Sequence, residues 1–122
     1  IDEGRVVSII ERAIPSFAWD DVLKLARDPA FSLVVSNVSE AGFRYEKANE
    51  PSLRDNPQSF PARLVRWLFE RFTTHGDAAE MVILPCELFA GNGEKLRVML
   101  NTVTRDANYP DDFANYLEQK VT

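Results

Sequence analysis

The sequence FSLVVS, residues 31–36, and the sequence MVILPC, residues 81–86, decide the fold of this chain. Both stretches are short and almost continuously apolar, and neither alternates between apolar and polar residues. Strands of a parallel sheet that are covered on both faces have this pattern. We therefore predict two buried parallel strands at residues 31–36 and 81–86.

Helical spacing of apolar residues surrounds the two strands. One such pattern covers residues 6–14, and a second covers residues 19–26 with Ser16 as its candidate N-cap. Between the strands, apolar positions within residues 64–72 predict a longer helix that is capped by Ser59 and carries an Arg66–Glu70 pair. After the second strand, helices are predicted to begin at Asn92 and near Pro110.

Alternation of helices and strands indicates an α/β fold with a parallel sheet. Two parallel strands do not make a sheet that is stable by itself, because such sheets normally contain several strands. We therefore expect part of a Rossmann-like, doubly wound parallel sheet that is incomplete in this chain. The alternative is a small complete α/β domain with further short strands. Residues 44–58 are polar and are expected to form a long loop.

Composition excludes several classes of protein. The 122 residues carry a net charge of −5, whereas nucleic-acid-binding and anionic-membrane-binding proteins normally have a basic excess. No apolar run approaches the roughly 18 residues of a membrane-spanning helix. The first residues show no basic segment followed by an apolar run, so we expect no signal peptide. One cysteine and one histidine leave few metal ligands, so we expect no metal site. The lone cysteine fits a reducing, cytoplasmic location.

Small polar residues follow each strand directly. The first strand leads into Ser36, Asn37, Ser39 and Glu40, and the second leads into residues 85–88. Ligands of open parallel sheets bind beyond the carboxyl ends of the strands. Such side chains hydrogen-bond ribose hydroxyls or a carboxamide. The same residue types are also common in turns, so the pattern leaves both interpretations open.

Other candidate residues have structural alternatives. Asn92 stands at a helix start, where it forms either a capped turn or an anion-binding end. Cys86 is most simply a small buried apolar residue. A nucleophilic role would need a nearby base, and the only histidine, His75, stands at the end of a predicted helix. Glu40 and Glu87 form an acid/base pair if the strand ends bring them together. The sequence contains no GxGxxG or GxxxxGK[ST] phosphate loop.

Three motifs resemble those of the tagaturonate reductases (altronate oxidoreductases) of the mannitol dehydrogenase, or polyol-specific long-chain dehydrogenase, family. Residues 34–43, VVSNVSEAGF, resemble the family segment VSNTTEAGI. Residues 59–64, SFPARL, are similar to SFPAKL, and residues 83–96, ILPCELFAGNGEKL, are similar to ILPCELIDRNGDKL. The three motifs stand in the family's order.

The resemblance implies an NAD-dependent oxidoreductase that interconverts D-tagaturonate and D-altronate by hydride transfer. Residues 1–122 would form the C-terminal portion of its Rossmann-type NAD-binding domain. The implied partners are NAD(H), a small sugar-acid substrate and the rest of the parent polypeptide. Residues expected at the cofactor are Ser36, Asn37, Ser39 and Glu40, and residues expected at the substrate cleft are Cys86, Glu87 and Asn92.

Departures from the family pattern limit what carries over. Val38 replaces one of the paired threonines, while Ser39 keeps a hydroxyl. Leu88 stands where mannitol dehydrogenases have an asparagine that holds the substrate oxygen, which favours the uronate branch. The family's glycine-rich turn and catalytic lysine have no counterpart here, so we expect the isolated chain to be inactive. The alternatives are a mannitol- or fructuronate-type polyol dehydrogenase and a non-catalytic α/β interaction module.

Overall fold

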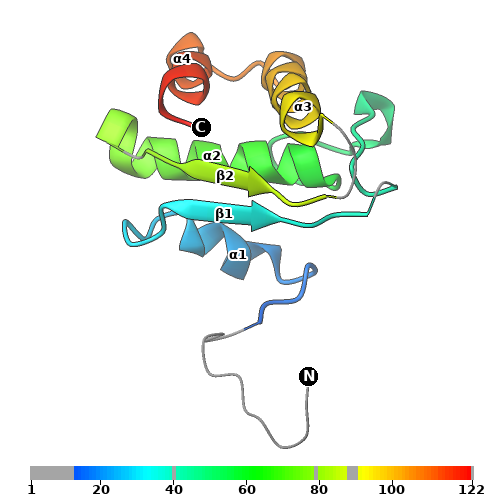
Figure 1. The fold of residues 1–122 in the computed structure, drawn as a ribbon, viewed down its shortest axis with the longest axis horizontal. Helices are drawn as coiled ribbons and strands as arrows, with labels where there is room; N and C mark the ends of the chain where they lie inside the picture. Colours follow the sequence, from blue (N-terminus) through cyan, green and yellow to red (C-terminus); the bar gives the residue numbers. More distant parts are fainter. Residues whose placement is uncertain (1–12, 40, 79, 88–90, 122) are drawn as a thin grey trace, which may run out of the picture.

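A computed structural model describes residues 13–39, 41–78, 80–87 and 91–121 of the chain. Strands and helices are mixed along the chain, which confirms the α/β class and is consistent with a partial Rossmann-like fold (Figure 1). The elements are α1 (Trp19–Leu25), β1 (Leu33–Ser36), η1 (Lys47–Asn49), α2 (Phe60–His75), η2 (Gly76–Ala78), β2 (Val82–Pro85), α3 (Asn92–Asp106) and α4 (Asp111–Lys120).

The two strands form a parallel pair, as predicted. Their register runs from Leu33 opposite Val82 to Ser36 opposite Pro85, and both arrows point the same way in Figure 1. The first strand is shorter than predicted because the N–H of Phe31 donates to the carbonyl of Asp28 in a turn (3.3 Å). Because α2 connects the strands, β1, α2 and β2 make one β-α-β unit.

The helix between the strands begins and packs as its sequence predicts. The hydroxyl of Ser59 accepts a hydrogen bond from the N–H of Ala62 at 3.3 Å, and Pro61 occupies the first turn. On the polar side of α2, Arg66 Nη1 lies 3.0 Å from Glu70 Oε1, which confirms the predicted pair. Arg27, just after α1, donates from Nε to the other carboxylate oxygen of Glu70 at 2.6 Å.

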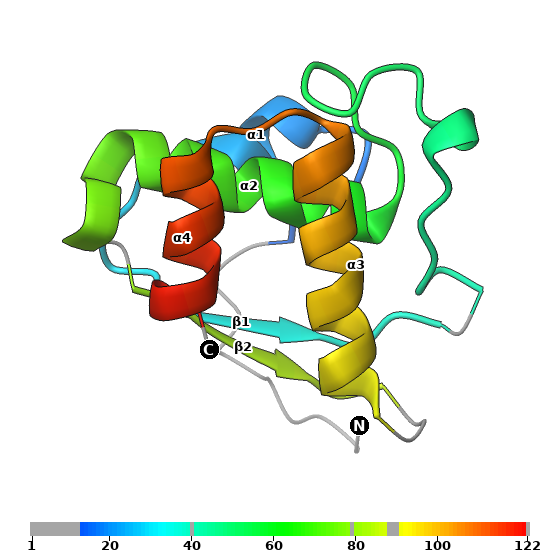
Figure 2. The ribbon, with the colours of Figure 1, turned by 90° about the horizontal axis from the view of Figure 1, so that it is seen from above.

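The core lies where α3 and α4 cross α2 (Figure 2). Helix α1 lies on the other side of α2, where the indole N–H of Trp67 donates to the carbonyl of Val22 at 3.0 Å (Figure 1). Apolar residues at helical spacing on the three long helices are buried in this core. The buried members are Leu64, Val65 and Leu68 of α2, Leu96, Leu100 and Val103 of α3, and Phe113, Tyr116 and Leu117 of α4.

One face of the sheet is exposed, which contradicts the prediction of strands covered on both sides. Leu33 and Val35 of β1 are 49% and 58% exposed, and Val82 and Leu84 of β2 are 43% and 47% exposed. Side chains alternate between the two faces of a strand, so the intervening Ile83 points into the core. The apolar runs are continuous, but the described part of the chain packs against only one face.

Three further expectations meet different outcomes. Ser16 does not cap α1, because a turn from the N–H of Ala18 to the carbonyl of Pro15 (3.0 Å) makes Ala18 the N-cap. The helix expected at residues 6–14 lies almost wholly outside the described residues. The segment 44–58 is a long connection that contains only η1 and a bridge between Ser52 and Asn56. None of the described helices is both long enough and apolar enough to cross a membrane.

Candidate functional site at the strand ends

The carboxyl ends of β1 and β2 meet, as the parallel pairing requires. The N–H of Cys86 donates to the carbonyl of Ser36 at 2.7 Å, which extends the ladder one residue beyond β2. Two residues further along the first segment, the N–H of Val38 donates to Oε2 of Glu87 at 2.9 Å. The two clusters singled out in the sequence are therefore hydrogen-bonded to each other.

The loop after β1 is a compact turn that depends on Gly42. The N–H of Gly42 donates to the carbonyl of Ser39 at 2.9 Å and lies 3.1 Å from its hydroxyl oxygen, and the N–H of Phe43 donates to the same carbonyl at 2.9 Å. A Cβ atom on Gly42 would lie 2.6 Å from Cγ1 of Val38. Val38 in turn packs against the core. Because Gly42 has no side chain, the side chain of Val38 can pack against the turn.

Substitution of Gly42 by alanine is expected to lower the free energy of unfolding by about 1–2 kcal/mol. The new methyl group overlaps the side chain of Val38, whose branched Cβ has few alternative rotamers. Urea unfolding followed by circular dichroism measures the loss. The matched control is Gly93→Ala, since no atom lies within 4 Å of a Cβ placed on Gly93. Equal stabilities of the two variants would refute this account of Gly42.

Glu87 is buried, although the sequence-based expectation places it at a cleft. Its side chain reaches back to the first loop and is 6% exposed overall. Within the described part of the chain, Oε1 of Glu87 and the hydroxyl oxygen of Ser36 are buried side-chain atoms that have no hydrogen-bond partner. Two polar groups that require partners therefore lie at the strand ends.

Asn92 is not the N-cap of α3. The cap is Gly91, whose φ of 70° lies in the left-handed region that favours glycine. The amide nitrogen of Asn92 instead donates to the carbonyls of Pro85 (3.0 Å) and Glu87 (3.2 Å), and its amide oxygen accepts from the N–H of Gly93 at 2.8 Å. Asn92 therefore ties the segment after β2 to the start of α3.

Asn37 and Ser39 are the exposed members of the candidate cofactor set. Their side chains are accessible at the carboxyl ends of the strands, whereas Ser36 is buried. Cys86 is exposed and its thiol lies 3.6 Å from the carbonyl of Leu84, so the prediction of a small buried residue is wrong. Cys86 lies beyond the paired strand, where the core does not cover it. Glu40, and with it the Glu40–Glu87 pair, lies outside the described residues.

Sequence reasoning missed two residues that order this region. Val38 contributes its backbone N–H, which no side-chain pattern reveals. Tyr45 donates from its hydroxyl to Oδ2 of Asp106 at 2.7 Å and so joins the connection after the loop to α3. Burial, followed by the hydrogen bond to Asp106 and the nearby carboxylate charge, raises the pKa of Tyr45 far above its usual range. The only sequence signal is a tyrosine within an otherwise polar segment.

The donors and acceptors at the strand ends suit a nucleotide cofactor in chemical type. An amide at Asn37 and a hydroxyl at Ser39 match ribose hydroxyls or a carboxamide, whereas the hydroxyl of Ser36, the last residue of β1, is buried and has no partner among the described residues. The chain has no glycine-rich loop for a pyrophosphate. The residues present therefore fit one part of a dinucleotide. The described residues contain no group of three or more His, Cys, Asp and Glu side chains placed to hold a metal ion.

Comparison with known proteins places these motifs in one group of enzymes. The chain is 39% identical to the altronate oxidoreductase of Cronobacter sakazakii over 123 residues, which is 97% of this chain and 25% of that protein. Identity to the altronate oxidoreductase of Halalkalibacterium halodurans is 34% over 98% of the chain and 24% of the relative. For the protein of Yersinia enterocolitica the identity is 38% over the whole chain and 26% of the relative.

The chain thus spans about a quarter of the length of the curated relatives that it matches. No protein-family model matches the chain. The resemblance to altronate oxidoreductases that the three motifs indicate is confirmed over nearly the whole sequence.

Proposed function

We propose that the chain is part of the NAD-binding domain of an altronate oxidoreductase. Altronate oxidoreductases are relatives of this chain over nearly its whole length. The reaction proposed for the parent is reversible hydride transfer between NAD(H) and a hexuronate-derived sugar acid, with D-tagaturonate and D-altronate as the pair. The observation that carries the proposal is the joining of the two family motifs at the carboxyl ends of neighbouring parallel strands.

The proposed roles follow from exposure. Asn37 and Ser39 are accessible and would hydrogen-bond the cofactor near its nicotinamide half, whereas Ser36 is buried. The exposed thiol of Cys86 and the amide of Asn92 lie on the segment that would border the cleft to the substrate domain. NAD(H), when bound, supplies the hydride; this chain contributes binding and orientation. A free, exposed Cys86 is also consistent with the proposed cytoplasmic location.

The exposed face of the two-stranded sheet supports the proposal that this chain contains only part of a larger sheet. A parallel sheet normally carries helices on both faces, and α2 covers one face of β1 and β2. Four aliphatic side chains stand about half exposed on the other face: Leu33, Val35, Val82 and Leu84. We propose that helices from the rest of the parent polypeptide cover them.

The outer edge of β2 supports the same conclusion. In a parallel ladder, successive residues direct their N–H and C=O groups to alternate edges. The N–H of Val82 donates to the carbonyl of Ser32 at 3.0 Å, and the N–H of Cys86 donates to the carbonyl of Ser36. Even-numbered residues of this segment therefore face β1, and odd-numbered residues face the opposite edge.

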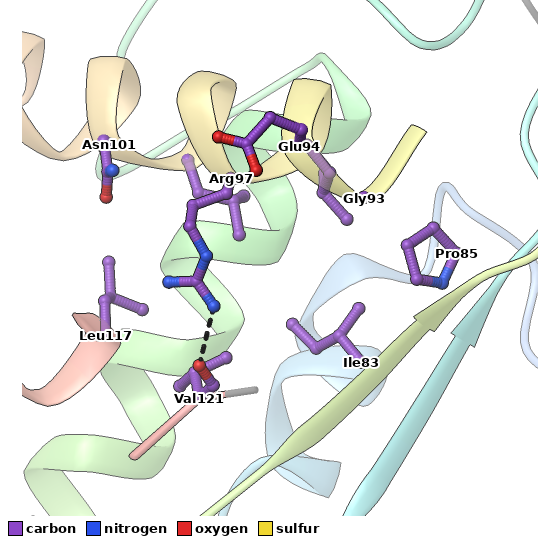
Figure 3. A pocket seen from close by; sticks show the side chains of 10 residues that line it. Ile83, Pro85, Gly93, Glu94, Arg97, Asn101, Leu117 and Val121 are labelled. Atoms are coloured by element: carbon purple, nitrogen blue, oxygen red, sulfur yellow. Dashed lines mark hydrogen bonds between the residues drawn. The ribbon is translucent and has the colours of Figure 1, made fainter. Parts of the chain in front are cut away.

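An isolated parallel bridge lies on that edge, outside the two strands. The N–H of Met81 donates to the carbonyl of Lys120 at 3.0 Å, and Met81 forms a parallel bridge with Val121. The guanidinium of Arg97 donates from Nη2 to the carbonyl of Val121 at 3.0 Å (Figure 3). The alternation makes Ile83 the next pairing position along β2, so we propose that the parent polypeptide extends this bridge into a third parallel strand.

A groove of about 250 Å³ runs beside β2 and would receive this strand. Figure 3 shows its walls on β2, on α3 and near the end of α4. Its apolar lining residues are Ile83, Pro85, Leu96, Leu100, Leu117 and Val121. Pro85 has no N–H, so the outer ladder would lose its donor at that residue.

The decisive experiment is titration of the full-length parent protein with NADH and NADPH, followed by turnover with a panel of keto sugars. We expect NADH binding and reduction of D-tagaturonate. Asn37→Ala should weaken NADH binding roughly tenfold, because it removes a hydrogen-bonding group from the ligand. The matched control is Asn115→Ala, since Asn115 is exposed on α4, away from the strand ends.

Each alternative function predicts a different result. Preference for mannitol or D-fructuronate over D-tagaturonate would indicate another polyol dehydrogenase of the family. Failure to bind either nicotinamide cofactor would leave a non-catalytic α/β interaction module, which would use the exposed sheet face and the β2 edge for assembly.

A further inference from the structure

We propose that Glu87 is a positioning residue whose buried carboxylate fixes the loop that presents Asn37 and Ser39. The inference rests on the proposed function only for the identity of the ligand. The direct contact is the 2.9 Å hydrogen bond from the N–H of Val38 to Oε2 of Glu87, between residues 49 positions apart in the sequence.

Val38 lies at the centre of the loop that Glu87 contacts. Asn37 precedes it and Ser39 follows it, so a shift of the Val38 backbone moves both exposed side chains. The side chain of Val38 packs on the core on one side and fits against Gly42 on another. The carboxylate of Glu87 supplies the remaining fixed point, at the backbone itself.

Glu87 is itself rigidly held, which a positioning residue requires. Its carbonyl accepts a hydrogen bond from the amide of Asn92 at 3.2 Å, and the same amide binds the carbonyl of Pro85 at 3.0 Å. The preceding residue, Cys86, is paired with the carbonyl of Ser36. The chain of contacts therefore runs from the start of α3 through Glu87 to the loop after β1.

Burial of a carboxylate lowers the free energy of unfolding unless both of its oxygens find partners. The side chain of Glu87 uses one oxygen on Val38, while its second oxygen is buried without a partner among the described residues. Such a group lowers stability relative to a well-packed apolar residue. A positioning role accounts for its burial, because its carboxylate fixes the geometry of the loop. Because Glu87 is 6% exposed, it acts through Val38 and does not contact a ligand directly.

Hydrogen–deuterium exchange of the full-length parent protein tests this role without turnover. In Glu87→Ala, we expect amide exchange in residues 36–42 to become about tenfold faster, with Val38 most affected. Glu87→Gln keeps an acceptor oxygen and should exchange close to the wild-type rate. Glu87→Asp keeps the charge but shortens the side chain by one methylene group, so it should resemble the alanine variant and replaces it if alanine prevents folding.

The control removes a carboxylate from the opposite end of β2. Glu80 is exposed and lies 3.7 Å from Lys120 Nζ, so Glu80→Ala should leave exchange in residues 36–42 unchanged. The KM for NADH should rise roughly tenfold in Glu87→Ala with kcat changed less than about twofold. A purely structural role would instead accelerate exchange throughout the chain.

The outcomes separate this inference from the proposed function. Unchanged exchange in residues 36–42 of the alanine and aspartate variants, or equally faster exchange everywhere, overturns the positioning role. Absence of NADH and NADPH binding by the wild-type protein contradicts the proposed function, and the exchange data still decide the role of Glu87.

Discussion

Replacement of Phe113 by alanine is expected to lower the free energy of unfolding by about 3–5 kcal/mol. Phe113 is completely buried on α4. Its ring centroid lies 5.1 Å from that of Phe69, 5.6 Å from that of Phe72 and 5.2 Å from that of Tyr109. Truncation removes these aromatic contacts and leaves a cavity where α2 and α4 meet.

Urea unfolding monitored by circular dichroism measures this loss. Phe17→Ala provides the matched control, because Phe17 is 88% exposed and its removal should change the free energy of unfolding by less than about 0.5 kcal/mol. Similar losses in the two variants would show that the aromatic cluster does not organise the core.

The second large effect is a loss of stability at alkaline pH. Burial raises the pKa of Tyr109 to about 12, although the charges of Arg66 and Arg54 oppose the rise. Burial also raises the pKa of Tyr116 to about 12. Because these folded-state pKa values exceed the unfolded value of 10.0, ionisation of the phenols favours the unfolded chain above pH 10, and the full stabilisation of the fold is present only below that pH. This stabilisation is lost as the pH rises from 10 to about 12, by about 2–3 kcal/mol for each tyrosine.

Tyr109→Phe separates the contribution of one phenol from general alkaline damage. The hydroxyl oxygen of Tyr109 is buried without a partner among the described residues, so its removal should not reduce stability at pH 7. The variant should retain more of its free energy of unfolding between pH 10 and 12 than the wild type does. Identical pH profiles for the two proteins would contradict the expected role of Tyr109.

Local sequence patterns predicted the elements well, because each pattern has a local physical cause. The N-cap at Ser59, the apolar positions of α2 and the Arg66–Glu70 pair involve residues three or four positions apart. Parallel pairing then followed from the alternation of strands and helices. It correctly placed the strand ends together, which brought the two polar clusters into contact.

Local sequence patterns could not predict the contacts inside the candidate site. The side chain of Glu87 is buried where it accepts a hydrogen bond from the backbone N–H of Val38, 49 positions away. A backbone donor cannot be recognised from residue types in the sequence. Asn92 has a favourable capping residue type, but the left-handed Gly91 takes that place and leaves the amide of Asn92 for Pro85 and Glu87. Cysteine is among the residue types most often buried, but Cys86 lies at an exposed position that the core does not cover.

The parallel pairing of β1 with β2 has a consequence for the order in which the chain folds. The strands pair residues 49 positions apart, so the segment between them must be compacted before the pairing repays the entropy of closure. Contacts of α2 with α3 close a shorter stretch of chain than the pairing of β1 with β2 does, and both helices contribute to the core. We therefore expect the helical layer to assemble first and β1 to join it late. Binding geometry at the strand ends would then be the last feature acquired by the nascent protein.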